Sequence, residues 1–517
     1  MNNLRISLSF FLILNCCNSS SDNTPSSDDA GTDAIASDAG NQDSSLHDAG
    51  NDAGAGTDKC DNVEFPPPNK ADGCRRILLT KYDGTAFSST SRVVSISRDG
   101  SLVAFQVFHK ESQYPGELYA LPDDTNEYDD IYAVDLDTME MEIISVSSSQ
   151  EIGNASSQSV DISADGRYVV FSSSATNFSE DAANPYLNQI YLRDRKEKTT
   201  TLVSLSNDNE AANAGCSQPV ISATGMHVVF SSFATNLVAD DTNGKSDLFV
   251  RHIAEQTTER ITMANSGQEH HTHAINDTTM ISDDGRYVLF VHGARLTEDD
   301  EDPDETGFFQ NDVFLYDRDT KMNTLISIAP DGFSNSPSNP VWLSPDGRHV
   351  IFDPGQGKEH YHPDASDLSL LITEAGSDIF DIFIDRDLND DEPYGGPGGY
   401  ARVSTDKQYI VFSSSRAGFV ENQSNRPDGI GEEWIENCYV YDRNTEDVYM
   451  VNSAEDGTPG VIMDYVSDET DMIDFIEYDM SGDGKRIAFS TIQYGIVDGF
   501  DIPCTQTPSN VYLRDCQ

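Results

Sequence analysis

The sequence is short of positive charge. Its 517 residues include 32 Lys and Arg against 89 Asp and Glu, which gives a formal net charge of −57. A protein that binds nucleic acid needs a basic surface to meet the phosphates, so this balance argues against nucleic acid as a partner. It also argues against polyanionic substrates unless cations intervene. The simplest explanation for the excess of Asp and Glu is solubility in an ion-rich environment outside the cell.

A long hydrophobic run is missing at the N-terminus. The apolar stretch at residues 6–14 is too short for a membrane-spanning helix, but with its basic flank it suits an export signal over residues 1–17. Cys16 and Cys17 follow the stretch, and this order resembles the lipobox of bacterial lipoproteins, in which a cysteine is acylated. Lipidation of Cys16 or Cys17 is therefore expected, with an ordinary cleaved signal peptide as the alternative.

Apolar residues are almost absent from residues 18–59, which are mainly Ser, Asp, Ala, Gly, Asn and Thr. Such a composition cannot bury a core, so the segment is predicted to be a disordered tether. A lipid anchor followed by a polar tether would hold a domain, residues 60–517, away from a membrane surface.

What the sequence does have is repetition. In the phrase DISADGRYVVF, residues 161–171, an apolar residue and a Ser precede an Asp-Gly turn, and apolar residues then alternate. Alternation at period two predicts a half-buried strand, and Asp-Gly between two such runs predicts a hairpin. Six further copies occur: SISRDGSLVAF, VISATGMHVVF, MISDDGRYVLF, WLSPDGRHVIF, RVSTDKQYIVF and DMSGDGKRIAF.

A second phrase follows the first, as in QIYLRDRKEKTTTLVS, and predicts two more strands around a charged turn. The unit is thus four antiparallel strands, and repeated four-stranded units are typical of propellers. The expected fold is an all-β, seven-bladed β-propeller of four-stranded antiparallel blades, which begin at about residue 91. In the fifth unit, the run after Asp385 leaves little room for a fourth strand.

The two ends of the repeat region predict ring closure. The chain stops after the third strand of the last unit, and residues 75–84 match a fourth strand, so the N-terminal strand is expected to complete the last blade. Cys74 and Cys516 flank the point where the two strands would meet, which predicts a disulfide between them. Cys438 and Cys504 are a second candidate pair, whereas Cys60 and Cys216 have no assigned partner.

Two loops on one face have oxygen-rich side chains at close spacing. DDTNEYDDIY and DDTNGKSDLF align with each other in the first and third units. Such ligands resemble part of a calcium loop, although the motif is shorter than an EF-hand and lacks its terminal Glu. Calcium is one expectation, and Asp and Asn bonded to backbone amides are the alternative. The six candidate ligands are Asp124, Asn126, Asp130, Asp241, Asn243 and Asp247.

Histidines gather in two other loops of the same face. They are His270, His271 and His273 in GQEHHTHAIND, and His360 and His362 in GKEHYHPD. With neighbouring carboxylates they are candidate ligands for zinc, manganese or copper, and solvated loops are the alternative. His227 and His349 take the place of Tyr168 in the repeat and are interpreted as structural.

The repeats resemble the TolB-type β-propeller, whose units carry S-x-D-G-x-x-V-x-F. Ser163, Asp165, Gly166, Val169 and Phe171 carry the motif here, and the resemblance runs from about residue 75 to the C-terminus. The N-terminal α/β domain of TolB has no counterpart. The resemblance implies a propeller of the periplasm, the outer membrane or the cell surface of a Gram-negative bacterium, used for protein interaction.

We therefore expect a lipid-anchored, monomeric scaffold that binds an envelope or surface protein. One alternative is a metal-dependent oligogalacturonate lyase, since some such propeller lyases hold a metal by histidine, but the chain offers no unambiguous general base. Another is a purely structural envelope protein. Peptidase chemistry is not expected, because the chain has no G-x-S-x-G element and no added hydrolase domain.

Overall fold

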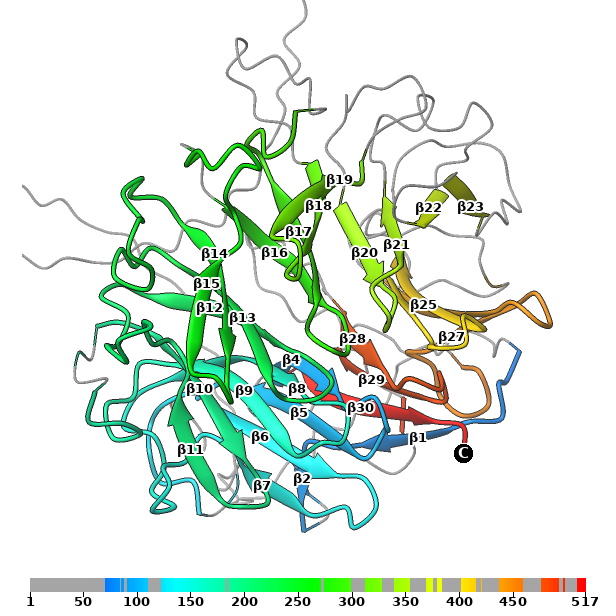
Figure 1. The fold of residues 1–517 in the computed structure, drawn as a ribbon. Helices are drawn as coiled ribbons and strands as arrows, with labels where there is room; N and C mark the ends of the chain where they lie inside the picture. Colours follow the sequence, from blue (N-terminus) through cyan, green and yellow to red (C-terminus); the bar gives the residue numbers. More distant parts are fainter. Residues whose placement is uncertain are drawn as a thin grey trace, which may run out of the picture. The chain divides into compact units, whose positions relative to one another are not determined.

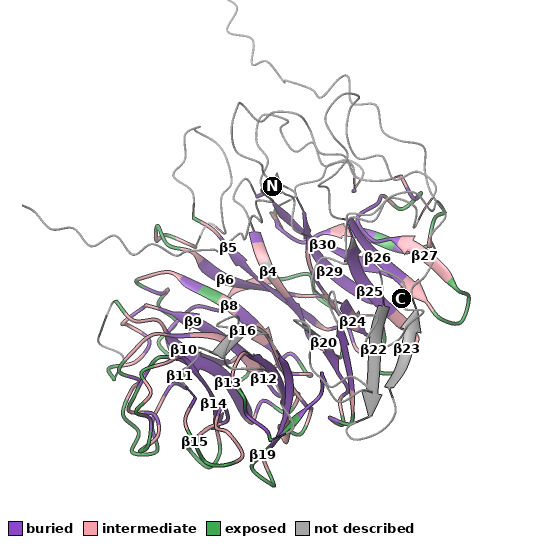
Figure 2. Cartoon of the chain, turned by 90° about the horizontal axis from the view of Figure 1, so that it is seen from above, coloured by how far each residue is buried: buried purple, intermediate pink, exposed green. Residues whose placement is uncertain are grey.

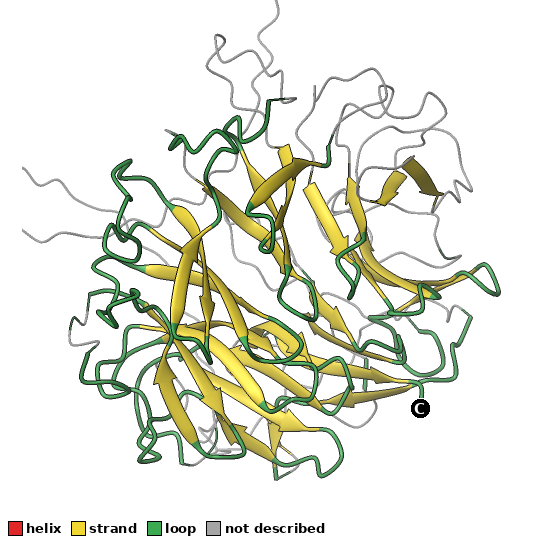
Figure 3. Cartoon of the chain, viewed as in Figure 1, coloured by secondary structure: helices red, strands yellow, loops and turns green. Residues whose placement is uncertain are grey.

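The computed structural model describes residues 70–109, 121–298 and 312–327, strands within 339–383 and 401–414, and residues 437–458, 476–497 and 509–517, all with short gaps. Contacts divide the chain into two units, Met1–Thr57 and Asp58–Gln517, and every described residue belongs to the second. The described elements are all β-strands (Figure 3), as predicted.

The strands form four-stranded antiparallel sheets in which neighbours in sequence are neighbours in space. The sheets are β4(Ser91–Ile96), β5(Leu102–Val107), β6(Asp130–Asp135), β7(Met141–Ile143); β8(Ser157–Ile162), β9(Tyr168–Ser173), β10(Gln189–Asp194), β11(Thr199–Leu202); β12(Cys216–Ile221), β13(His227–Ser232), β14(Asp247–His252), β15(Thr257–Arg260); β16(Ala274–Ile281), β17(Tyr287–His292), β18(Asp312–Asp317), β19(Met322–Leu325); β20(Asn339–Leu343), β21(His349–Asp353), β22(Ser369–Glu374), β23(Ile379–Phe383); β24(Ala401–Val403), β25(Tyr409–Ser414), β26(Asn437–Asp442), β27(Asp447–Met450); and β28(Glu477–Met480), β29(Arg486–Thr491), β30(Asn510–Asp515), β1(Arg75–Leu78). A separate hairpin joins β2(Lys81–Tyr82) and β3(Thr85–Ala86).

The sheets follow one another around an axis (Figure 1). Their first strands contact in the order β4, β8, β12, β16, β20, β24 and β28, and β28 contacts β4 again. The apolar core lies between the faces of neighbouring sheets, where the alternating Val, Ile and Phe of the repeats meet. Burial is accordingly concentrated in the strands (Figure 2). This is the arrangement of a β-propeller.

The prediction of seven equivalent blades needs a correction at the fifth repeat. Six of the sheets are complete blades, with described side chains in all four strands, whereas β22 and β23 of the remaining sheet are described only as backbone. Six complete blades, not seven, are therefore described. The fourth strand of the remaining sheet ends at Phe383, before the acidic, Gly-rich run that begins at Asp385.

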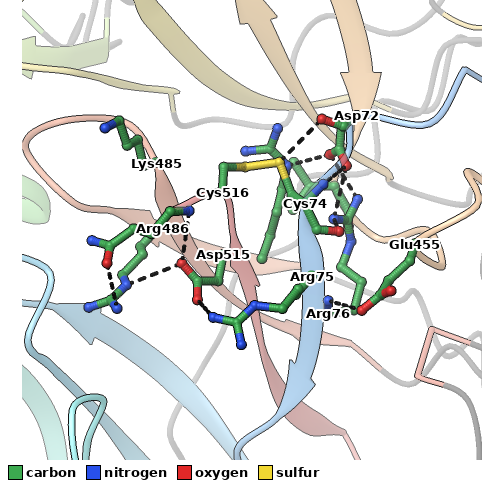
Figure 4. Close-up of a disulfide and its surroundings, with 12 residues drawn as sticks. Asp72, Cys74, Arg75, Arg76, Glu455, Lys485, Arg486, Asp515 and Cys516 are labelled. Carbon is green, nitrogen blue, oxygen red and sulfur yellow. Dashed lines mark hydrogen bonds and ion pairs between the residues drawn. A yellow bond between two sulfur atoms is a disulfide. The ribbon is translucent and has the colours of Figure 1, made fainter.

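The predicted closure is confirmed. β1 pairs antiparallel with β30, from Arg75 opposite Asp515 to Leu78 opposite Tyr512, and so covers the outer edge of the last sheet. Cys74 and Cys516 form the predicted disulfide beside this pair (Figure 4), across a sequence separation of 442 residues. The disulfide removes chain entropy from the unfolded state, and the strand pair removes an open edge.

Buried charges reinforce the same joint. Asp72 lies between two guanidinium groups: its Oδ2 is 3.0 Å from Arg76 Nη2 and 2.6 Å from Arg514 Nε, and all three side chains are buried. Burial opposes the charge, but the two arginines outweigh it and lower the pKa of Asp72. Arg76 Nε also donates to the carbonyls of Val451 and Ser453, which ties β1 to the preceding sheet.

The glycine in the turn between the first two strands of a sheet packs against the sheet before it. Gly225 has φ +74°, and a Cβ placed there would lie 2.3 Å from Cδ2 of Tyr168 in the preceding sheet. Gly285 meets His227 in the same way, which confirms that His227 occupies the structural place of Tyr168. The glycine is therefore needed for close approach as well as for its backbone conformation.

A pair of substitutions separates these two roles. Gly244 also has positive φ, at +63°, but a Cβ there would meet nothing within 4 Å. We expect Gly244→Ala to lower the free energy of unfolding by about 1 kcal/mol through backbone strain alone, and Gly225→Ala to lower it by about 2–4 kcal/mol. Urea unfolding of both variants measures the difference. Equal losses would contradict a role for the contact with Tyr168.

Candidate functional site

The loop before β14 does not hold its acidic residues open for calcium, because an arginine already lies among them. Arg260 Nη1 is 3.2 Å from Asp241 Oδ1, 3.6 Å from Asp247 Oδ2 and 2.9 Å from Glu269 Oε1. Asn243 Nδ2 donates to Asp247 Oδ2 at 3.1 Å. The prediction that Asp241, Asn243 and Asp247 lie together is confirmed, but the positive charge among them is the guanidinium of Arg260 and not a calcium ion.

The equivalent loop before β6 has no such arginine. Arg260 lies opposite Phe249, and the residue in the matching register is Ile143, opposite Tyr132. Asn126 Nδ2 donates to Asp130 Oδ2 at 2.8 Å, and Asp124 Oδ1 is buried without a hydrogen-bond partner among the described residues. Burial raises the pKa of Asp124, and it raises the pKa of Asp130 to about 7. Calcium binding stays a prediction, and this loop suits it better than the loop with Arg260.

One of the candidate histidines is described, and it is buried. His270 Nε2 lies 2.8 Å from Asp247 Oδ1, and its ring stacks edge-on against His292 with centroids 4.3 Å apart. Burial, aided by the neighbouring His270, lowers the pKa of His292 to about 3. His271, His273, His360 and His362 lie outside the described residues, so the transition-metal site and the lyase hypothesis stay predictions. Within the described ranges, no three or more His, Cys, Asp or Glu group in a way that could hold a metal ion.

The second predicted disulfide, between Cys438 and Cys504, stays a prediction, because Cys504 lies outside the described residues. Cys438 lies fully buried in β26, in the apolar layer between two sheets with Val411 and Val451. Cys60 also lies outside the described residues. Cys216 is a buried thiol, and burial raises its pKa to about 12.

Aromatic side chains are exposed at the end of the sheets where the second and third strands join. Tyr128 precedes β6 and is 45% exposed, Tyr186 precedes β10 and is 92% exposed, and Phe233 follows β13 and is 52% exposed. They belong to three consecutive sheets. The end with the Asp-Gly turns also has two exposed methionines, Met139 and Met322. The repeat pattern does not single out these three aromatics, because the aligned positions of other units hold other residues, such as Lys245 for Tyr128 and Ser174 for Phe233.

A cavity of about 370 Å³ lies among the first strands of the sheets. Its lining includes Asp161, Trp342, Arg402 and Asp479, each of which stands two places before the Ser of a repeat turn. This position varies between polar, charged and apolar residues from repeat to repeat, whereas the residue after it is always apolar. This variation could have indicated the cavity from the sequence, but the motifs considered above do not include the position.

Comparisons with known proteins show no family for this chain. No family model matches the chain, and no curated protein matches it. Solved structures that resemble it include the β-propeller domain of the Trilobed protease from Pyrococcus furiosus, at 11% identity and a TM-score of 0.45 over 83% of this chain and 96% of that one. Oligogalacturonate lyase from Vibrio parahaemolyticus has 11% identity and a TM-score of 0.45, over 87% and 96%. TolB from Acinetobacter baumannii has 11% identity and a TM-score of 0.33, over 82% and 79%.

These likenesses concern the propeller arrangement alone. In the part of the chain that the structure describes, no helix is long and apolar enough to cross a membrane.

Acid sensitivity follows from the buried histidines. Burial, together with the nearby Arg318, lowers the pKa of His227 to about 4, whereas an unfolded histidine titrates near 6.5. The contribution of His227 to stability is complete above about pH 6.5 and is lost as the pH falls toward 4. In this range the histidine is protonated in the unfolded chain but stays neutral in the folded chain.

His227→Tyr restores the residue found at this place in other repeats, such as Tyr168 and Tyr287. When the pH is lowered from 6.5 to 4, the free energy of unfolding should fall in both proteins. We expect the fall to be smaller in the variant by on the order of 2 kcal/mol. Urea unfolding at both pH values measures this. Parallel losses in the two proteins would show that His227 does not contribute.

Proposed function

We propose that the protein is an exported β-propeller that serves as a protein-interaction scaffold in the cell envelope. The observation that carries the proposal is the set of exposed aromatics, Tyr128, Tyr186 and Phe233, on the loops of three consecutive sheets. Tyr and Phe are enriched in protein interfaces, where they bury large areas at low entropic cost. The strong net negative charge favours a partner with a basic rim around its contact surface.

The compartment is part of the same proposal. Disulfides persist outside the reducing cytosol, so the bond between Cys74 and Cys516 supports export. The apolar stretch at residues 6–14, with Cys16 and Cys17 behind it, supports lipid attachment. A lipid on one of these cysteines and the polar segment 18–59 would hold the propeller near a membrane while its loops stay accessible.

Lipid attachment is tested by growing expressing cells with a clickable fatty acid. The parent protein should be labelled, and Cys16→Ala or Cys17→Ala should abolish labelling, because acylation needs the cysteine thiol. Cys216→Ala is the control, since that thiol is buried. Labelling that survives both N-terminal substitutions would contradict acylation of Cys16 or Cys17, and an unlabelled parent protein would leave the ordinary signal peptide as the explanation.

The interaction surface is tested by site-specific photocrosslinking in intact cells. A photoreactive phenylalanine at position 186 should give a discrete adduct with an envelope protein. The same residue at position 322 should not, because Met322, although 45% exposed, starts β19 at the end with the Asp-Gly turns. Changing Tyr128 and Phe233 to Ala should lower the adduct yield at position 186 at least tenfold, the effect of losing interface anchors worth about 1–2 kcal/mol each. Equal adducts at both positions would overturn the proposed surface.

A further inference from the structure

Each repeat contributes one side chain to the same level of the central cavity. The residue two places before the turn Ser lies on the first strand of its sheet, opposite a buried apolar residue of the second strand, as Asp161 lies opposite Val170. All of these residues line the cavity of about 370 Å³. In chain order they are Ser95, Asp161, Val220, Met280, Trp342, Arg402 and Asp479.

The ring of side chains has two unlike halves. The polar half comes from four consecutive sheets, whose first strands are β24, β28, β4 and β8. The other half, on β12, β16 and β20, is Val220, Met280 and Trp342. Because the sheets follow one another around the axis, the charged groups stand on one side of the cavity and the apolar groups on the other. A ligand that filled it would need one charged or polar end and an apolar body.

Two arginines, Arg98 and Arg402, line the cavity, but neither forms an ion pair with Asp161. Arg98 is paired with Asp283. Arg402 Nε lies 3.3 Å from Asp479 Oδ1, so these two form a pair. Asp161 accepts from Ser95 Oγ at 3.2 Å and from the backbone N–H of Ile221 at 2.8 Å, and both donors are neutral. Among the described residues, no Lys, Arg or His forms an ion pair with Asp161. Burial, together with the charge of Asp479, raises the pKa of Asp161 to about 6, so the carboxylate is ionised at neutral pH without a countercharge.

A purely structural role accounts for only part of this arrangement. Asp161 and Asp479 each accept a backbone N–H from the next sheet, at Ile221 and Ile96, and so staple neighbouring sheets. However, Val220, Met280 and Trp342 hold the same position with no carboxylate, so the ring does not need this staple at every junction. A neutral acceptor such as Asn would also make the hydrogen bond without burying a charge.

The backbone beside Asp161 is strained. Ser159 has φ +55° and Gln218 has φ +52°, a backbone conformation that residues other than glycine rarely adopt. Both stand where β8 and β12 shift register against their neighbouring strands. Such bulges re-aim side chains, and strain of this kind gathers at ligand sites. Here it accompanies the residues that face the cavity.

We propose that the central cavity binds a small organic amine, with its ammonium group at Asp161 and its apolar body against Val220, Met280 and Trp342. The indole of Trp342 suits an aromatic or branched body, and the volume falls in the range of small-molecule sites. A bare metal ion fits less well, because the described residues offer no group of three or more acidic or histidine ligands. This site is separate from the exposed aromatics of the loop face.

A charge series of one indole skeleton tests the proposal by isothermal titration of the full-length protein. Tryptamine should bind, tryptophol should bind at least tenfold more weakly, and indole-3-propionate should show no binding. Between pH 7.5 and 5 the affinity for tryptamine should fall, since the amine keeps its charge while the carboxylate at the site takes up a proton. Equal binding of tryptamine and tryptophol would overturn the assignment of the ammonium group to Asp161.

Three variants locate the site. Asp161→Asn keeps an acceptor for the Ile221 N–H and should weaken tryptamine binding at least tenfold. Val220→Lys leaves Asp161 intact but places a lysine ammonium beside it. Because this cation competes with the amine, tryptamine binding should again weaken at least tenfold. Asp137→Asn, in the exposed turn after β6, removes one carboxylate elsewhere and should change nothing. Unchanged affinity in both cavity variants overturns the proposal. The proposal is also overturned if calcium displaces tryptamine from the parent protein but not from Asp161→Asn, because the cavity would then be a site for an inorganic cation.

Discussion

The pairing of β1 with β30 is the constraint on which the ring depends. Without β1, the last sheet would have three strands and an open row of backbone donors and acceptors at its edge. The disulfide at Cys74 and Cys516 and the buried charges around Asp72 act at the same joint, and each reaches a different neighbour: the disulfide holds the end of β30, and Arg76 reaches the sheet before it. Strand, covalent bond and charge therefore stabilise a single closing contact.

The repeats predicted the strands and the closure because their signals are local. Alternation and Asp-Gly turns act within about ten residues, and the missing fourth strand could be found by comparing the ends of the units. The departure at the fifth repeat was visible in the same way, as a Gly-rich run after Asp385. Arg260 was missed because its place among Asp241, Asp247 and Glu269 depends on the pairing of β15 with β14, which brings the end of β15 beside the loop before β14.

The cavity residues illustrate a second limit. In a single repeat, nothing distinguishes Asp161 from a solvent-facing aspartate, since polar residues alternate with apolar ones on either kind of strand. Only the closed ring shows that this position faces the axis, and only the set of all repeats shows that the polar and apolar residues are segregated. The burial of Cys438 has a related explanation: an even number of cysteines says nothing about which of them lie in the core.

The separation of 442 residues between Cys74 and Cys516 has a consequence for biosynthesis. β1 is among the first strands to be synthesised, and β30 is the last. The strand that closes the ring must therefore wait, with its apolar face and one backbone edge uncovered, until nearly the whole chain has been synthesised. The intermediate sheets can pack on one another in the order in which they emerge, but the ring can close only once β30 is available. Protection of residues 75–78 from aggregation is therefore a requirement of folding, set by the order of strands rather than by the finished fold.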